Sequence, residues 1–124
     1  MPSAFDEAFE SFAAPMLDNH FGVTVVFYRG QMKSAPFVMV WNTQEYEVVD
    51  SDGFATVVRS RDGIAKVSDV VVNGQTIDPR EGDRIKEVET GDVYELMPIG
   101  KRPAAEVMPG EYRWIMHTKR IKQG

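Results

Sequence analysis

The chain has 124 residues, of which 43% are apolar, and this length suits one domain with a single hydrophobic core. It contains no cysteine, which excludes disulfides, thiolate metal sites and cysteine nucleophiles. The net charge is −5, and an acidic chain lacks the basic face that is typical of general duplex-DNA binders. Acids stand where a signal peptide carries bases, and no apolar run approaches the ~20 residues that span a bilayer. We therefore expect a protein made and used in the cytoplasm.

Residues 3–20 are expected to form an N-terminal α-helix. Ser3 can cap this helix, and two acids follow in its first turn, where the helix dipole favours negative charge. Apolar side chains then recur at helical spacing and predict one apolar stripe. We expect the stripe to dock on the rest of the domain or on a neighbouring subunit. Its members are Phe5, Phe9, Phe12 and Met16.

From residue 22 onward, short apolar stretches alternate with turn signals every eight to twelve residues, which is typical of a small β-barrel or sandwich. Asp50-Ser-Asp-Gly53 and Asn73-Gly74 predict hairpin turns, and Arg61-Asp-Gly63 carries a further turn signal. The fold class is therefore expected to be mostly β, with one short N-terminal helix. Strands are expected at residues 23–28, 37–41, 45–49, 54–61, 84–88, 93–97 and 112–118, and residues 64–72 as strand, helical turn and strand.

The expected organisation is a single domain over residues 1–124. It comprises the helix, a β-barrel-like body at 22–119 and a basic tail at 120–124. Two longer connections, residues 29–36 and 98–110, are expected to be loops. The second holds three prolines and two glycines, which favour a loop over a regular element.

The sequence contains no constellation that points to catalysis or metal binding. His20 and His117 are far apart and have no second ligand at metal spacing, so His117 is expected to hydrogen-bond locally on the last strand. Paired carboxylates fall at i, i+2 spacing, where solvent-facing strand residues also fall. The segment 50–53 lacks the remaining ligands of a calcium loop. By elimination we expect a binding or assembly protein, with no enzymatic activity, no cofactor and no metal.

The second half of the chain carries a pattern that resembles the small head–tail joining proteins of tailed bacteriophages and prophages, also called head-closure or stopper proteins. In that family a short helix precedes a β-barrel-like domain. The resemblance covers residues 21–119, with a departure from the family's pattern at 104–110. The segments that carry it are Val71-Val-Asn-Gly74, Ile77-Asp-Pro79, Gly82-Asp-Arg-Ile85, Val93-Tyr-Glu-Leu-Met-Pro98 and Met116-His-Thr-Lys119.

This resemblance implies a structural virion protein that forms a ring under the portal, seals the DNA channel and docks the tail. Its implied partners are further copies of itself, the portal or adaptor protein, the tail-terminator or tail-tube protein and the genomic DNA, with no membrane. It would assemble in the host cytoplasm and end at the head–tail interface of the virion. In such a ring, exposed loops and the basic end are expected to make the partner contacts. The residues concerned are Arg29, Met32, Lys33, Lys101, Arg102, Val107, Met108, Lys119, Arg120 and Lys122.

Two other interpretations stay open. A tail-completion or terminator ring protein would share the layout of a helix and a β body. A small cytosolic β-barrel that binds a ligand or a nucleic acid would share the body alone. Only Tyr112-Arg-Trp114 interleaves aromatic and basic residues as single-strand binders do, which is weak support for the nucleic-acid alternative.

Overall fold

The computed structural model describes residues 22–110 and 112–124, and these are mostly β, as predicted. The expected N-terminal helix, with its stripe Phe5, Phe9, Phe12 and Met16, lies outside the described residues. Within them, the helical content is one 3-10 turn, η3 (Val67–Asp69). The strands are β1 (Gly22–Arg29), β2 (Met32–Lys33), β3 (Phe37–Val49), β4 (Ala55–Lys66), β5 (Val71–Val72), β6 (Gln75–Thr76), β7 (Arg84–Glu87), β8 (Val93–Leu96), β9 (Ala105–Val107) and β10 (Arg113–Lys122).

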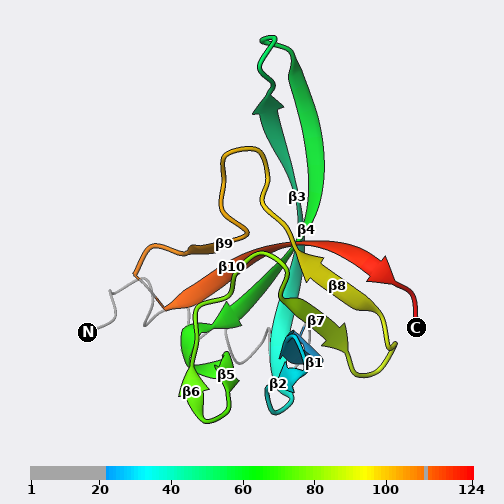
Figure 1. Ribbon diagram of the computed structural model, residues 1–124, viewed down its shortest axis with the longest axis vertical. Coiled ribbons are helices and arrows are strands. Elements are labelled where there is room, and N and C mark those ends of the chain that lie inside the picture. The colour runs from blue at the N-terminus through cyan, green and yellow to red at the C-terminus, as the bar shows by residue number, and fades with distance from the viewer. Residues whose placement is uncertain (1–21, 111) are drawn as a thin grey trace.

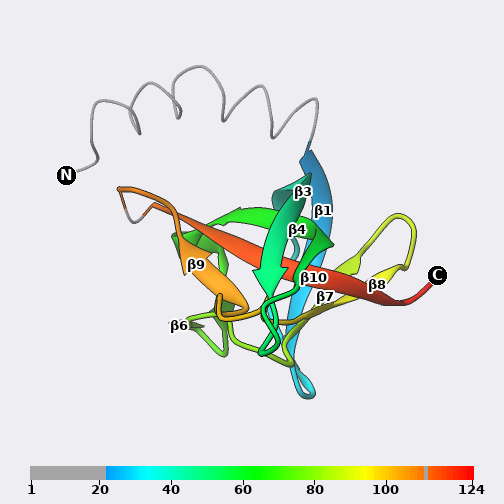
Figure 2. The same ribbon diagram turned by 90° about the horizontal axis from the view of Figure 1, so that it is seen from above.

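Antiparallel pairing links most strands into one sheet with the order β2-β1-β3-β4-β10-β8-β7 (Figure 1). β7 also pairs with β1, so the pairing path returns to the strand near its start. β9 pairs with β10 beside this path, where the two strands run next to each other (Figure 2). β5 and β6 form a separate two-stranded sheet. No helix in the described part of the chain is both long and apolar enough to cross a lipid bilayer.

The hydrophobic core lies on the inner face of this curved sheet. Alternate residues of β7 and β8 are buried, as expected for strands with one face toward a core and one toward solvent. The cluster draws on strands from both halves of the chain, so both halves must be in place before it is complete. Its largest fully buried apolar members are Phe27, Met39, Ile85, Leu96 and Met116.

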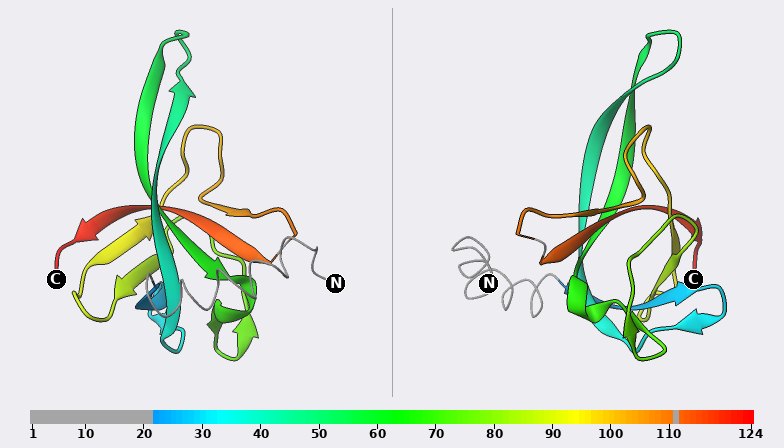
Figure 3. Two further views of the ribbon diagram at one scale, coloured as in Figure 1. Left: turned by 180° about the vertical axis from the view of Figure 1, so that it is seen from behind. Right: turned by 60° about the vertical axis from the view of Figure 1, so that its left-hand side comes forward.

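The most prominent element is the hairpin of β3 and β4, whose outer half extends well beyond the rest of the sheet (Figures 1 and 3). The hairpin around the turn at 50–53 was predicted correctly: Asp50 Oδ1 accepts the N–H groups of Asp52 and Phe54 at 2.9 Å. The two strands expected at 37–41 and 45–49 are one continuous strand, because Asn42 and Thr43 pair with β4 without interruption. We call the projecting residues 45–58 the arm.

The turn expected at Arg61-Asp-Gly63 was wrong, because all three residues lie inside β4. Gly63 allows the Met39 side chain of the neighbouring strand to pack closely against β4. A Cβ built on it would lie 2.7 Å from the Sδ atom of Met39, which is fully buried on the neighbouring strand. The turn at Asn73-Gly74 was predicted correctly, and both residues have the positive φ that a tight hairpin requires, 54° and 76°. The expected strand, helical turn and strand over 64–72 is likewise confirmed by β4, η3 and β5.

The two expected loops contain regular structure. The connection 29–36 is largely a tight hairpin in which β2 pairs with β1, because Gly30 supplies a positive φ of 61° at the turn. The connection 98–110 contains β9, which hydrogen-bonds along β10. The basic end is also ordered as strand: Arg120 and Lys122 belong to β10 and pair with β8, so the tail expected at 120–124 is strand up to Lys122.

Candidate functional site

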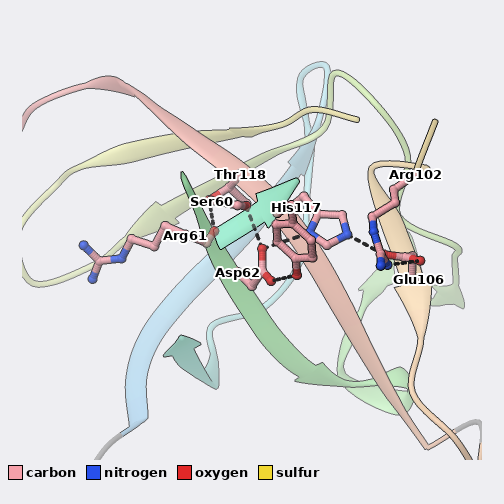
Figure 4. Close-up of polar contacts among 8 residues, drawn as sticks. Ser60, Arg61, Asp62, Arg102, Glu106, His117 and Thr118 are labelled. Carbon is pink, nitrogen blue, oxygen red and sulfur yellow. Dashed lines mark hydrogen bonds and ion pairs between the residues drawn. The ribbon is translucent and has the colours of Figure 1, made fainter. Parts of the chain in front are cut away.

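A cluster of polar side chains lies at the root of the arm, on the outer face of β4 (Figure 4). His117 of β10 stands directly opposite Asp62 of β4 in the strand pairing, so both side chains share one face of the sheet. The His117 Nδ1 atom lies 2.8 Å from Asp62 Oδ1, and its Nε2 atom lies 2.5 Å from Glu106 Oε2. Ser60 and Tyr46 donate to Asp62 at 2.6 and 2.5 Å. We call Tyr46, Ser60, Asp62, Glu106 and His117 the polar cluster.

These contacts shift the ionisation of the cluster. Burial alone would lower the pKa of His117, but its hydrogen bonds to Asp62 and Glu106 outweigh burial and hold that pKa above its ordinary value. Burial alone would raise the pKa of Asp62, but hydrogen bonds from His117, Ser60 and Tyr46 hold it below its ordinary value. The geometry therefore favours a protonated His117 between two carboxylates, with both ring nitrogens donating.

The cluster attaches the 98–107 segment to the arm. Arg102 lies 3.3 Å from the Glu106 carboxylate, and its guanidinium stands 5.0 Å from the centre of the Tyr46 ring. Further along the arm, a Cβ on Gly100 would lie 3.0 Å from Val48, so the two segments are in close contact there. The segment thus braces one face of the arm at its root.

A second group of side chains occupies the opposite face of β4, because successive strand residues point to opposite faces. The Arg61 guanidinium lies 4.8 Å from the centre of the Trp41 ring and 5.2 Å from that of Tyr94. It also lies 3.5 Å from Glu87, a buried carboxylate to which Trp41 donates a hydrogen bond of 2.5 Å. These contacts hold Arg61 in place on this face.

Arg61 forms part of a basic groove beside the root of the arm. The groove has a volume of about 520 Å³, and its lining contains four basic side chains and no acidic one. Two of the basic residues come from β4 and two from β10. Its lining residues are Thr43, Arg59, Ser60, Arg61, Tyr94, Thr118, Lys119 and Arg120.

Of the predicted partner contacts, the structure places Lys119 and Arg120 in this groove, and Lys122 follows on the same strand. All three side chains are exposed. Sequence reasoning missed Arg59 and Arg61, because no local signal relates them to residues almost sixty positions later. The one available indication was the predicted strand at 54–61, in which successive side chains point to opposite faces, so that residues 59 and 61 share one face.

The remaining predicted contacts are spread over the surface. Met32 and Lys33 lie exposed on β2, Lys101 and Arg102 beside the arm, and Val107 on β9, whereas Met108 is half-buried. Arg29 is held within the fold: it forms a two-pronged ion pair with Asp83 at 2.7 and 3.0 Å and donates to the Asp78 carbonyl at 2.7 Å. The structure does not bring these residues together in one place, and their partner contacts stay predictions.

The polar cluster differs from what the sequence predicted for His117. A local hydrogen bond was expected, but its partner Asp62 lies 55 positions away in the chain. The cluster is also poorly suited to nucleophilic catalysis, because the Ser60 hydroxyl donates to Asp62 and not to the imidazole. Among residues 22–110 and 112–124, no group of three or more His, Asp or Glu side chains is arranged to hold a metal ion. What the arrangement does physically is fasten the arm to the body.

Comparison with known proteins identifies the family. No curated protein sequence matches the chain. The sequence model of one family, described as phage head-tail joining protein, matches it over residues 6–124. This match includes the ten strands of the described residues, the polar cluster and the basic groove. The chain therefore belongs to the phage head-tail joining protein family.

Proposed function

We propose that the protein is a head-closure, or stopper, protein that forms a ring under the portal of a tailed phage, seals the DNA channel and docks the tail. The observation that carries this proposal is the family match over residues 6–124, which is nearly the whole chain. The sequence resemblance in the closing segments points to the same role. The protein would then reside at the head–tail interface of the virion.

The distribution of surface features supports an assembly role. The described body, which we regard as barrel-like because β7 pairs back to β1, carries exposed apolar side chains at its periphery. Met32 on β2 and Val107 on β9 are 44% and 42% exposed, and both stand on the connections expected to meet partners. The net charge of −5 suits a channel through which DNA passes, because like charge keeps phosphates from adhering.

The proposal is tested by removing the gene from its phage. We expect heads and complete tails to accumulate separately, and we expect the heads to lose their packaged DNA. Both defects should disappear when the wild-type gene is supplied in trans. Electron microscopy of the lysate and a nuclease-protection assay of packaged DNA measure the two effects. Normal tailed virions would refute the proposal. Tails of irregular length on sealed heads would instead assign the protein to tail completion.

A further inference from the structure

We propose that the arm of one copy docks in the basic groove of a second copy, so that the contact repeats head to tail around the assembly. The inference rests on the proposed ring and names the surfaces that would build it. It starts from the arm, which leaves both its strands largely exposed beyond the brace at Gly100. A hairpin that projects alone into water is marginally stable, so this element needs a partner.

The arm carries the most exposed apolar side chains of the described residues. Phe54, Val57 and Val49 are 70%, 64% and 60% exposed, more than any other large hydrophobic residue there. Strand pairing sets Val49 opposite Ala55, and Glu47 opposite Val57, so these four side chains share the face that the 98–107 segment leaves uncovered. An exposed apolar patch of this kind marks a protein contact.

The charge of the arm indicates which surface of a second copy it contacts. Residues 45–58 contain four acidic side chains, Glu45, Glu47, Asp50 and Asp52, and no basic one. The basic groove presents the opposite charge on the same molecule. Within the described part of the chain, no ion pair involves its Arg59 or Lys119, so both cations are available to carboxylates of another copy. Complementary charge of this kind sets orientation and register at an interface.

The groove also offers apolar surface to the arm. Its exposed apolar surface comes from the aliphatic stems of the basic side chains and from Thr43, whereas Tyr94 and Thr118 are buried at 2% and 6% exposure. The groove lies at the root of the arm and not at its tip. When the arm tip of one copy enters the groove of a second copy, the groove of the first copy therefore stays open for a third. Such a contact is heterologous and closes into a ring when the rotation between neighbours permits it.

The cysteine-free chain makes this contact testable by disulfide trapping. Ser51 lies in the tip and Thr43 in the groove, eight residues apart along the hairpin, or about 27 Å, which is too far for a disulfide within one copy. We expect oxidation of an equimolar mixture of Ser51→Cys and Thr43→Cys to give mixed dimers, and the double variant to give a ladder of linked species. Gln75→Cys, on the separate β5–β6 hairpin, replaces Thr43→Cys in the matched control.

Charge variants provide the second arm of the experiment. Glu47→Lys with Asp52→Lys in the arm, or Arg59→Glu with Lys119→Glu in the groove, should each reduce trapping at least tenfold, whereas Arg80→Glu with Lys86→Glu should leave it unchanged. Combining the arm and groove reversals should restore much of it. Trapping is measured in purified protein and in particles that contain it.

The inference would be overturned if disulfide trapping of Ser51→Cys with Thr43→Cys did not exceed that of the Gln75→Cys control in either preparation. It would also be overturned if the double variant formed only a dimer with two disulfides, because the contact would then be reciprocal and not head to tail. Loss of head–tail joining in the arm variant without any copy-to-copy trapping would mean that the arm meets another virion component. In that case the proposed function would stand and this inference would fall.

Discussion

Arg61 and Asp62 are neighbours in the chain, yet they serve opposite faces of β4. Asp62 is held in the polar cluster by His117, Ser60 and Tyr46, whereas Arg61 stacks on aromatic rings beside the basic groove. One dipeptide therefore connects the brace on one face of the arm with the groove on the other. Breaking either side removes a partner from a buried charged group, which costs more than losing an exposed ion pair.

The stability that the polar cluster contributes should depend on pH. Because the pKa of His117 is raised in the fold, its stabilising contribution is complete below the ordinary histidine value of about 6.5 and is lost as pH rises through the raised pKa. Because the pKa of Asp62 is lowered, its contribution is complete above the ordinary value of about 3.9 and is lost as pH falls through the lowered pKa. The cluster is therefore most stabilising between these two limits.

His117→Gln should lower the free energy of unfolding by about 3–5 kcal/mol near pH 5.5, since it leaves the buried Asp62 carboxylate without its cation. The difference from wild type should shrink as pH rises past the raised pKa of His117. Urea unfolding from pH 5 to 9 measures it. Ser60→Ala, which removes a neutral donor to Asp62, is the control and should cost about 1.5–3 kcal/mol with little change across this range. A pH-independent loss in His117→Gln would contradict the assignment.

The sequence predicts those turns and strands whose conformation is determined by a few adjacent residues. Asn73-Gly74 and the Asp50 turn were identifiable because their conformations depend on a few adjacent residues. Contacts between distant segments were not identifiable. His117 meets Asp62 55 positions away, and Arg29 meets Asp83 54 positions away, with no spacing rule that relates them. Gly63 was misread for the same reason, since its cause, Met39, lies on another strand.

That reinterpretation of Gly63 is testable. Gly63→Ala should destabilise the protein by about 1–3 kcal/mol, because the new methyl group overlaps the buried Met39 side chain. The same change in a Met39→Val background should cost less, because the shorter side chain leaves room. Chemical denaturation of the four proteins forms a double-mutant cycle. Equal losses in both backgrounds would show that Met39 is not the cause.

At the scale of the whole molecule, charge is unevenly distributed along the chain. Residues 1–62 contain nine acids and four bases, whereas residues 63–124 contain ten of each. The fold keeps this separation on its surface, with acids along the arm and bases gathered at the end of β10. A subunit of this kind has a preferred direction of association, which suits ordered stacking between a head and a tail.

The corresponding prediction concerns the basic end. Changing Lys119, Arg120 and Lys122 together to Glu should weaken docking to DNA-filled heads or to tails, and more so at low salt. The melting temperature should stay close to that of wild type, because among residues 22–110 and 112–124 these side chains form one ion pair, Arg120 with Asp92 at 3.8 Å; its Arg120 end is exposed, and such a pair is worth only ~0–1 kcal/mol. Co-sedimentation across a salt series measures docking. The triple change to Gln should be intermediate, and unchanged docking at low salt would make this end a solvated strand terminus.

The return of β7 to β1 has a consequence for how the chain is made. β1 emerges from the ribosome early and can pair with β2 and β3 soon afterwards, but it cannot pair with β7 until Glu87 has been synthesised, and β4 waits for β10. Such distant pairings slow folding, into the range of milliseconds to seconds for domains dominated by them. During that interval unpaired strand edges are exposed, and the nascent chain is vulnerable to aggregation. Newly made subunits therefore become competent for assembly only after β10 has been synthesised and has paired with β4 and β8.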